Sequence, residues 1–122
     1  MPRKAREHGY SRRHRFSASG SFGPVLRSGR KLRGEAIVVH AAEGRPGASR
    51  LGVALTRRLV PSAVDRNLAK RVLREIFRRH PLKHAGLDCV ITLRQPFRAD
   101  SAAAIRAEAT RFFDLLGEGR GR

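Results

Sequence analysis

The chain has 122 residues, 40% of them hydrophobic, which suits one domain with one modest core. The longest clean apolar run, residues 36–39, is far short of the roughly 18 residues that a membrane-spanning helix needs, and a single cysteine excludes an internal disulfide. With 27 Lys and Arg residues against 10 Asp and Glu residues, the formal net charge is +17. A compact domain with so much self-repulsion usually has a polyanionic partner, and nucleic acid is the leading candidate.

The two ends of the chain differ from its middle in composition. Residues 1–15 are polar and basic and lack the apolar stretch of a secretory signal, so we expect a flexible N-terminal segment and a cytoplasmic protein. Residues 117–122, GEGRGR, are a Gly/Arg tail with nothing to bury. The sequence therefore predicts one folded domain over residues 16–116.

The first half of this domain predicts one helix and two strands. A short helix is expected within residues 21–29, although Gly23 and Pro24 lower its propensity. Residues 35–40 (EAIVVH) and 51–56 (LGVALT) have the apolar character of strands, and the Gly/Pro-rich segment between them is typical of a loop. We expect these two strands to pair antiparallel.

Residues 63–80, AVDRNLAKRVLREIFRRH, predict an amphipathic helix that begins at a capping box formed by Ser62 and Asp65. At about 100° per residue, one side gathers Leu68, Ala69, Val72, Leu73 and Ile76, and the opposite arc gathers Asn67, Lys70, Arg71, Arg74 and Arg78. Like charges four residues apart destabilise an isolated helix by roughly 0.2 to 0.5 kcal/mol per pair. A solvated surface helix would more often mix signs, so we interpret the arc as a face that phosphates neutralise.

The last third of the domain predicts a strand over residues 88–93 and a helix over residues 102–116, separated by Pro96. In the helix, Asp100 or Ser101 is the expected cap, Ile105, Ala109, Phe112 and Leu116 are the expected buried stripe, and Gly117 is the expected stop. Cys89 in the strand is expected to be a small buried hydrophobe. Together these elements predict an α+β fold: a two-layer α/β sandwich with a small, mostly antiparallel sheet and three helices, in the order α-β-β(-β)-α-β-α.

The ionisable residues do not suggest a catalytic site within this chain. A protein nuclease that uses metal ions needs converging carboxylates, yet no two of the 10 acids lie within three residues of each other. His8 and His14 lie in the N-terminal segment, and His80 and His84 flank a Pro-Leu turn, so no His pair is expected to converge for acid–base catalysis. The sequence therefore predicts neither catalytic residues nor a metal site.

The segment AVDRNLAKRVLRE resembles the signature of the protein subunit of bacterial ribonuclease P, in which an Arg-Asn pair, a Lys-Arg pair and a further Arg lie along one helix. The resemblance continues in order through RFSASGSFGPVLRSG, RLGVALTRRL and DCVITLRQPF, and it covers residues 15–116. The chain departs from the signature at residues 60–62 (Val-Pro-Ser), where it is one residue longer, and at Leu68, where the family has a second Arg. These departures affect the start of the helix and one RNA contact.

The resemblance implies a subunit of a ribonucleoprotein endonuclease that removes the 5′ leader from precursor tRNA, with the catalytic site in a large RNA and Mg2+ held mainly by that RNA. The implied partners are the ribonuclease P RNA and precursor tRNA, with the protein monomeric in the complex. Carried over by position, the residues that would face the catalytic RNA are Arg66, Asn67, Lys70, Arg71 and Arg74, with Arg57 and Arg58 at the strand exit.

Phe22 and His40 match positions that line the leader cleft of this family. Aromatic and imidazole rings suit unpaired bases because stacking tolerates any base. The alternatives are simple core packing for Phe22 and an ordinary surface position for His40.

Two other functions share part of the pattern. A ribosomal-type structural RNA-binding protein would have a similar composition, and the ordered family segments are what separate the two. A helix-turn-helix DNA-binding protein that used residues 63–80 as its recognition helix would need a companion helix just before it. There RLGVALTRRL predicts a strand and a loop instead.

Overall fold

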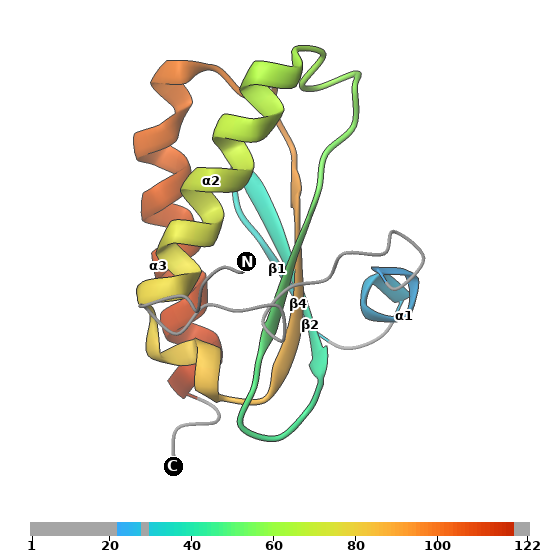
Figure 1. Ribbon diagram of the computed structural model, residues 1–122, viewed down its shortest axis with the longest axis vertical. Helices are drawn as coiled ribbons and strands as arrows, with labels where there is room; N and C mark the ends of the chain where they lie inside the picture. The colour runs from blue at the N-terminus through green and yellow to red at the C-terminus, as the bar shows by residue number, and fades with distance from the viewer. Residues whose placement is uncertain (1–21, 28–29, 119–122) are drawn as a thin grey trace, which may run out of the picture.

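The computed structural model describes residues 22–27 and 30–118, which form three α-helices and a four-stranded sheet. In chain order the elements are α1 (Phe22–Arg27), β1 (Arg30–Arg33), β2 (Ile37–Glu43), β3 (Arg50–Ala54), α2 (Ala63–Arg79), β4 (Leu87–Leu93) and α3 (Ala102–Glu118), with short 3-10 turns at Pro81–His84 and Ala99–Ser101. Figure 1 shows α2 and α3 side by side on one face of the sheet and α1 on the opposite face. The predicted α+β class is confirmed, and the expected terminal segment 1–15 lies outside the described residues.

The strand order in the sheet is β1-β2-β4-β3. β2 pairs antiparallel with both β1 and β4, whereas β3 pairs with β4 in parallel. The expected antiparallel pairing of residues 35–40 with residues 51–56 is therefore wrong, because β4 lies between these two strands. The helix α2 permits this arrangement, since a helical crossover can return the chain parallel to the strand it left.

β1 is a strand that the sequence pattern does not predict. Its sequence, RKLR, contains a single apolar residue, Leu32, and its other three residues are exposed. β1 lies at the edge of the sheet, where it pairs with β2 alone. Positive side chains on an edge strand discourage the pairing of a further strand, so the basic composition suits this position.

The main core lies between the sheet and the helix pair. Most of the predicted stripe residues are buried: Ala69, Val72 and Leu73 on α2, and Ile105, Ala109, Phe112 and Leu116 on α3. The predicted Leu68 and Ile76 are half-buried, and the buried Phe77 and Phe113 were not predicted. The rings of Phe77 and Phe113 meet edge to face with their centroids 5.8 Å apart, where α2 and α3 touch. No described helix is both long and apolar enough to cross a membrane.

The ends of the two long helices were only partly predictable. Ser62 is the N-cap of α2, and its Oγ accepts a hydrogen bond of 3.3 Å from the Asp65 N–H, as the capping pattern predicts. The expected stop of α3 at Gly117 is wrong, because the helix continues to Glu118. Gly117 does not have the positive φ angle that a C-capping glycine adopts.

We call the sheet face that carries α1 the outer face. Val25 of α1 packs on Val90 of β4, and the half-buried Phe22, Ala42 and Ala54 surround this pair. Side chains alternate between the two faces along a strand, so His40, which pairs with Val90, also lies on the outer face. This small second core fixes α1 beside His40.

Candidate nucleic-acid interface

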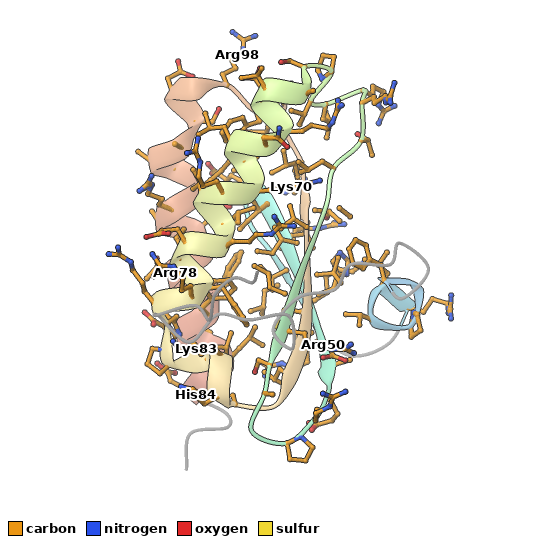
Figure 2. The ribbon with its side chains drawn as sticks, in the orientation of Figure 1. Arg50, Lys70, Arg78, Lys83, His84 and Arg98 are labelled. Atoms are coloured by element: carbon orange, nitrogen blue, oxygen red, sulfur yellow. The ribbon has the colours of Figure 1, made fainter. Side chains whose placement is uncertain are left out.

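The cations predicted on α2 do gather on one side of that helix. Asn67 and Arg71 are exposed, Lys70 and Arg74 are half-buried, and residues three or four apart are neighbours on a helix surface. Figure 2 shows Lys70 projecting from the side of α2 that faces away from α3. The exposed Arg57 and Arg58 precede α2 in the turn after β3. We call Arg57, Arg58, Asn67, Lys70, Arg71 and Arg74 together the α2 basic surface.

Positive charge on α2 is partly compensated at its C-terminal end but not in its middle turns. Glu75 forms ion pairs with Arg78 and, at 2.9 Å, with Arg79. Within the described part of the chain, none of the five cations of the α2 basic surface has an ion-pair partner. The arrangement therefore presents an uncompensated field to an anionic partner.

Arg66 has a different environment from the other predicted RNA-facing residues. Its Nη1 donates hydrogen bonds to the carbonyl oxygens of Val60, at 2.9 Å, and Pro61, at 3.0 Å. The side chain thus folds back over the start of the helix instead of extending into solvent. Leu68, where the family signature has a second Arg, packs against the main core.

Phe22 and His40 lie near each other on the outer face. Phe22 packs against the cluster of Val25 and Val90, and Val90 is the strand partner of His40. Phe22 is half-buried, so it contributes to packing while part of its surface remains accessible. His40 occupies the middle of β2 with 9% of its surface exposed, so the alternative of an ordinary surface position is wrong.

The His40 imidazole is biased toward its neutral form. Burial lowers its pKa from the ordinary value of 6.5, and the positive charge of Lys31 lowers it further. Lys31 is the strand partner of His40 on β1. A neutral ring beside a cation suits contact with a base whose own phosphate lies nearby.

The sequence pattern missed the two basic residues of β1 on the outer face. Lys31 pairs with His40 and Arg33 pairs with Val38, and both cations are exposed. In RKLR the apolar Leu32 lies between two charged residues, Lys31 and Arg33. This is the only local signal that the two cations lie on one face of a strand. It is weak because the segment lacks the apolar and β-branched residues that identify strands.

The structure does not bring the two sets of predicted residues into one site. The α2 basic surface belongs to the helical layer, whereas Phe22 and His40 lie on the outer face, on the other side of the sheet (Figure 1). The edge strand β3 leads directly into the turn that carries Arg57 and Arg58. The predicted residues therefore form two separate surfaces, because β3 and β1, which carries Lys31 and Arg33, are opposite edges of the sheet.

The carboxylates that are well placed in the fold are engaged in structural contacts. Asp88 accepts from Arg50 at 2.9 Å, Asp114 bonds to His80 at 2.7 Å, and Glu108 accepts from backbone N–H groups. Over residues 22–27 and 30–118, no group of three or more His, Cys, Asp or Glu side chains could hold a metal ion.

Cys89 does not supply a nucleophile either. The thiol is fully buried in β4, as the sequence predicts, and burial raises its pKa to about 12, with a further contribution from Asp88. A thiol with that pKa is almost entirely protonated at neutral pH.

Comparison with known proteins places this fold and this pattern of residues in one family. The Ribonuclease P family model matches residues 10–117. The chain is 32% identical over 103 residues to the ribonuclease P protein component of Azoarcus sp. (strain BH72), covering 84% of this chain and 86% of that protein. It is 30% identical over 110 residues to the protein component of Thioalkalivibrio sulfidiphilus, covering 90% of this chain and 92% of that protein.

Solved structures agree with the sequence comparison. The ribonuclease P protein of Thermotoga maritima superposes with a TM-score of 0.64 at 26% identity, covering 85% of this chain and 96% of that one. The protein from Staphylococcus aureus, at 22% identity, has the same fold with a TM-score of 0.65. A helix-turn-helix protein would need a helix before α2, where this chain has β3 and a turn. This chain belongs to the ribonuclease P protein family.

Proposed function

We propose that this chain binds the ribonuclease P RNA through the α2 basic surface and the single-stranded 5′ leader of precursor tRNA through the outer face of the sheet. Family membership makes the chain a protein subunit of ribonuclease P, the ribonucleoprotein that removes the 5′ leader from precursor tRNA. The ribonuclease P RNA is accordingly its partner. The proposal assigns the two surfaces to the two RNA ligands.

The observation that carries the first assignment is the uncompensated charge in the middle of α2. Glu75 pairs with two arginines at the C-terminal end of the helix, while Lys70, Arg71 and Arg74 have no acidic partner in the described part of the chain. Repulsion among them destabilises the free helix, and phosphate oxygens relieve it by charge-assisted hydrogen bonds. The release of condensed counterions from the RNA adds to the driving force.

The second assignment rests on the combination of rings and cations on the outer face. The half-buried Phe22 offers a surface on which an unpaired base stacks, His40 lies beside it with 9% of its surface exposed, and Lys31 and Arg33 lie on the neighbouring strand for the phosphates. Single-stranded nucleic acid is bound in this way by other proteins, through stacking rings flanked by positive charge. A leader of variable sequence requires such sequence-tolerant contacts.

The chemistry of cleavage is assigned to the RNA subunit. Asp88, Glu108 and Asp114 each hold a structural partner, so they are not available to bind catalytic ions. We place Mg2+ mainly with the RNA, where it would activate the attacking water and stabilise the leaving oxygen. The protein contributes binding and orientation, as a single copy in the complex.

Reversal of one charge on each long helix tests the α2 assignment. Arg71→Glu reverses the charge of an exposed residue of the α2 basic surface. Arg106→Glu reverses the charge of an exposed residue of α3 and is the matched control. We expect Arg71→Glu to weaken binding to ribonuclease P RNA by roughly tenfold to a hundredfold, the loss of a charge-assisted contact. Arg106→Glu should have a much smaller effect. Equal losses would show that a diffuse positive field, and not this surface, binds the RNA.

A further inference from the structure

Arg66 makes contacts that do not suit a phosphate-binding residue. One of its two terminal nitrogens, Nη1, bridges the carbonyl oxygens of Val60 and Pro61 at 2.9 and 3.0 Å. The side chain is only half-exposed. Nη1 is therefore directed into the loop that precedes α2, and this one nitrogen holds two neighbouring carbonyls at once.

The loop before α2, residues 55–62, carries Arg57 and Arg58. Hydrogen bonds to Thr56 also hold the end of this loop that follows β3. The Val60 N–H donates to the Thr56 carbonyl at 2.9 Å, and the Leu59 N–H donates to Thr56 Oγ1 at 3.3 Å. The Val60 side chain is fully buried in the main core. These contacts close the turn that presents the two exposed arginines.

Arg66 joins this turn to the first turn of α2. Its own N–H donates to the Ser62 carbonyl at 2.9 Å as the first bond of the helix, while its side chain reaches back across the N-cap to Val60 and Pro61. Pro61 has no N–H, so the backbone at this point cannot form an additional turn bond of its own. The guanidinium supplies the link at this point.

We propose that Arg66 is a positioning residue, which holds the loop so that Arg57 and Arg58 stand beside Asn67 and Arg71 as one RNA-binding surface. This inference rests on the proposed function of the α2 basic surface. Arg66 contributes to affinity through the two loop arginines, and its own charge is secondary. The position of its Nη1 donor matters more than its positive charge.

Conservative replacement separates these two roles. Arg66→Lys keeps the charge but loses the longer, planar guanidinium that places Nη1 between the two carbonyls, and Arg66→Gln loses both the charge and this donor. We expect both variants to weaken binding to ribonuclease P RNA about tenfold, similarly to the double change Arg57→Ala/Arg58→Ala. In that double-mutant background, Arg66→Lys should have little further effect, because the residues that it positions are gone.

Three results would overturn the inference. If Arg66→Lys binds RNA as tightly as the wild type while Arg66→Gln does not, the charge itself contacts phosphate. If Arg66→Gln lowers the salt dependence of RNA binding equally in the wild type and in the Arg57→Ala/Arg58→Ala background, Arg66 likewise contacts a phosphate directly. If the variants lower only the melting temperature and leave affinity unchanged, Arg66 stabilises the fold and positions nothing.

Amide hydrogen exchange provides a second measurement that does not depend on RNA. In Arg66→Lys the protected N–H of Val60 should exchange faster, while the amides in the middle of α2 keep their protection. Unchanged protection at Val60 would contradict the inference. Arg71→Glu is measured in parallel: if it binds RNA normally, the proposed function of the surface fails, whereas normal binding by Arg66→Lys alone refutes only the positioning role.

Discussion

The Glu108 carboxylate of α3 accepts a hydrogen bond of 3.0 Å from the backbone N–H of Ala36. The same carboxylate also accepts from the N–H groups of Glu35, at 2.7 Å, and Ile37, at 3.1 Å. One side chain therefore satisfies three consecutive donors where the chain enters β2, and it ties α3 to the sheet. A Cβ atom on Gly34 would overlap this carboxylate, so glycine is required for the close approach.

Removing this carboxylate should destabilise the fold. Glu108→Ala leaves the N–H groups of the buried Ala36 and Ile37 without an acceptor, which costs about 1 to 3 kcal/mol. Gly34→Ala should act through the same contact, because it displaces the carboxylate. Denaturant unfolding of both single variants and of the double variant checks this. The double variant should lose less unfolding free energy than the two single variants lose together. Strict additivity would mean that the two residues act independently.

The charge of Glu108 should also appear in the pH dependence of stability. Burial alone would raise the pKa of this carboxyl, but the three backbone hydrogen bonds and Arg111 outweigh burial and lower it below its ordinary value of 4.5. The stabilisation is therefore complete above about pH 4.5 and is lost as the pH falls through the lowered value. Glu108→Gln should flatten the stability curve in this acidic range. Glu118→Gln, at the C-terminal end of the same helix, removes an equal charge and serves as the control. The dependence of stability on pH in this variant should resemble that of the wild type.

His40 predicts a second, separate pH effect. Its lowered pKa means that the unfolded chain binds a proton more readily than the folded one, so stability falls as the pH drops below about 6.5. His40→Phe keeps a ring on the outer face and removes the titration. The difference in unfolding free energy between wild type and variant should be constant above neutral pH and should shift in favour of the variant below pH 6.5. A difference that does not change between pH 7 and pH 5 would refute this assignment.

Local patterns predicted the elements of this fold better than their arrangement. The cap at Ser62 and the apolar stripe of α2 depend on residues a few positions apart, so both were readable from the sequence. β1 was missed because a basic edge strand lacks apolar alternation, and the order of β2, β4 and β3 depends on the crossover helix rather than on any strand. Such long-range pairing leaves no local signal.

The same distinction applies to the candidate site. Exposure of Arg71 followed from the periodicity of α2, whereas the role of Arg66 did not, because its acceptors are backbone carbonyls that every residue has. The burial of His40 likewise depends on its neighbours across the strands, Lys31 and Val90. A side chain whose partners lie across the sheet, or whose acceptors are carbonyls outside any recognised capping pattern, becomes visible only in the structure.

Binding to the ribonuclease P RNA should depend strongly on salt. Each phosphate that the protein neutralises contributes roughly 0.7 to 0.9 to the slope of log K against log salt concentration. Arg71→Ala should therefore reduce the magnitude of the slope by about one such unit, whereas Arg79→Ala, which removes a partner of Glu75, should leave it nearly unchanged. Filter binding over a series of salt concentrations gives both slopes. A slope near zero for the wild type would indicate a mainly apolar interface.

The protein alone should not cleave precursor tRNA. No cluster of acidic, His or Cys side chains in the described residues can hold a metal ion, and Asp88 and Glu108 are engaged in structural bonds. Purified protein freed of RNA should leave the leader attached, and addition of ribonuclease P RNA should restore cleavage at low Mg2+ concentration. Cleavage by the RNA-free protein that survives removal of contaminating nucleases would contradict this prediction.

The outer face should distinguish precursor tRNA from mature tRNA, which lacks the leader. Lys31→Glu reverses an exposed charge next to His40 without touching either core, because Lys31 lies on the exposed edge strand. In the complex with ribonuclease P RNA, we expect this variant to weaken binding of precursor tRNA by roughly tenfold or more, the loss of one charge-assisted contact, and to leave binding of mature tRNA nearly unchanged. Arg106→Glu on α3 should affect neither ligand. Because the two tRNA forms differ only in the leader, an equal loss for both would place Lys31 against the body of the tRNA or the catalytic RNA, and the leader would then have to bind elsewhere on the protein.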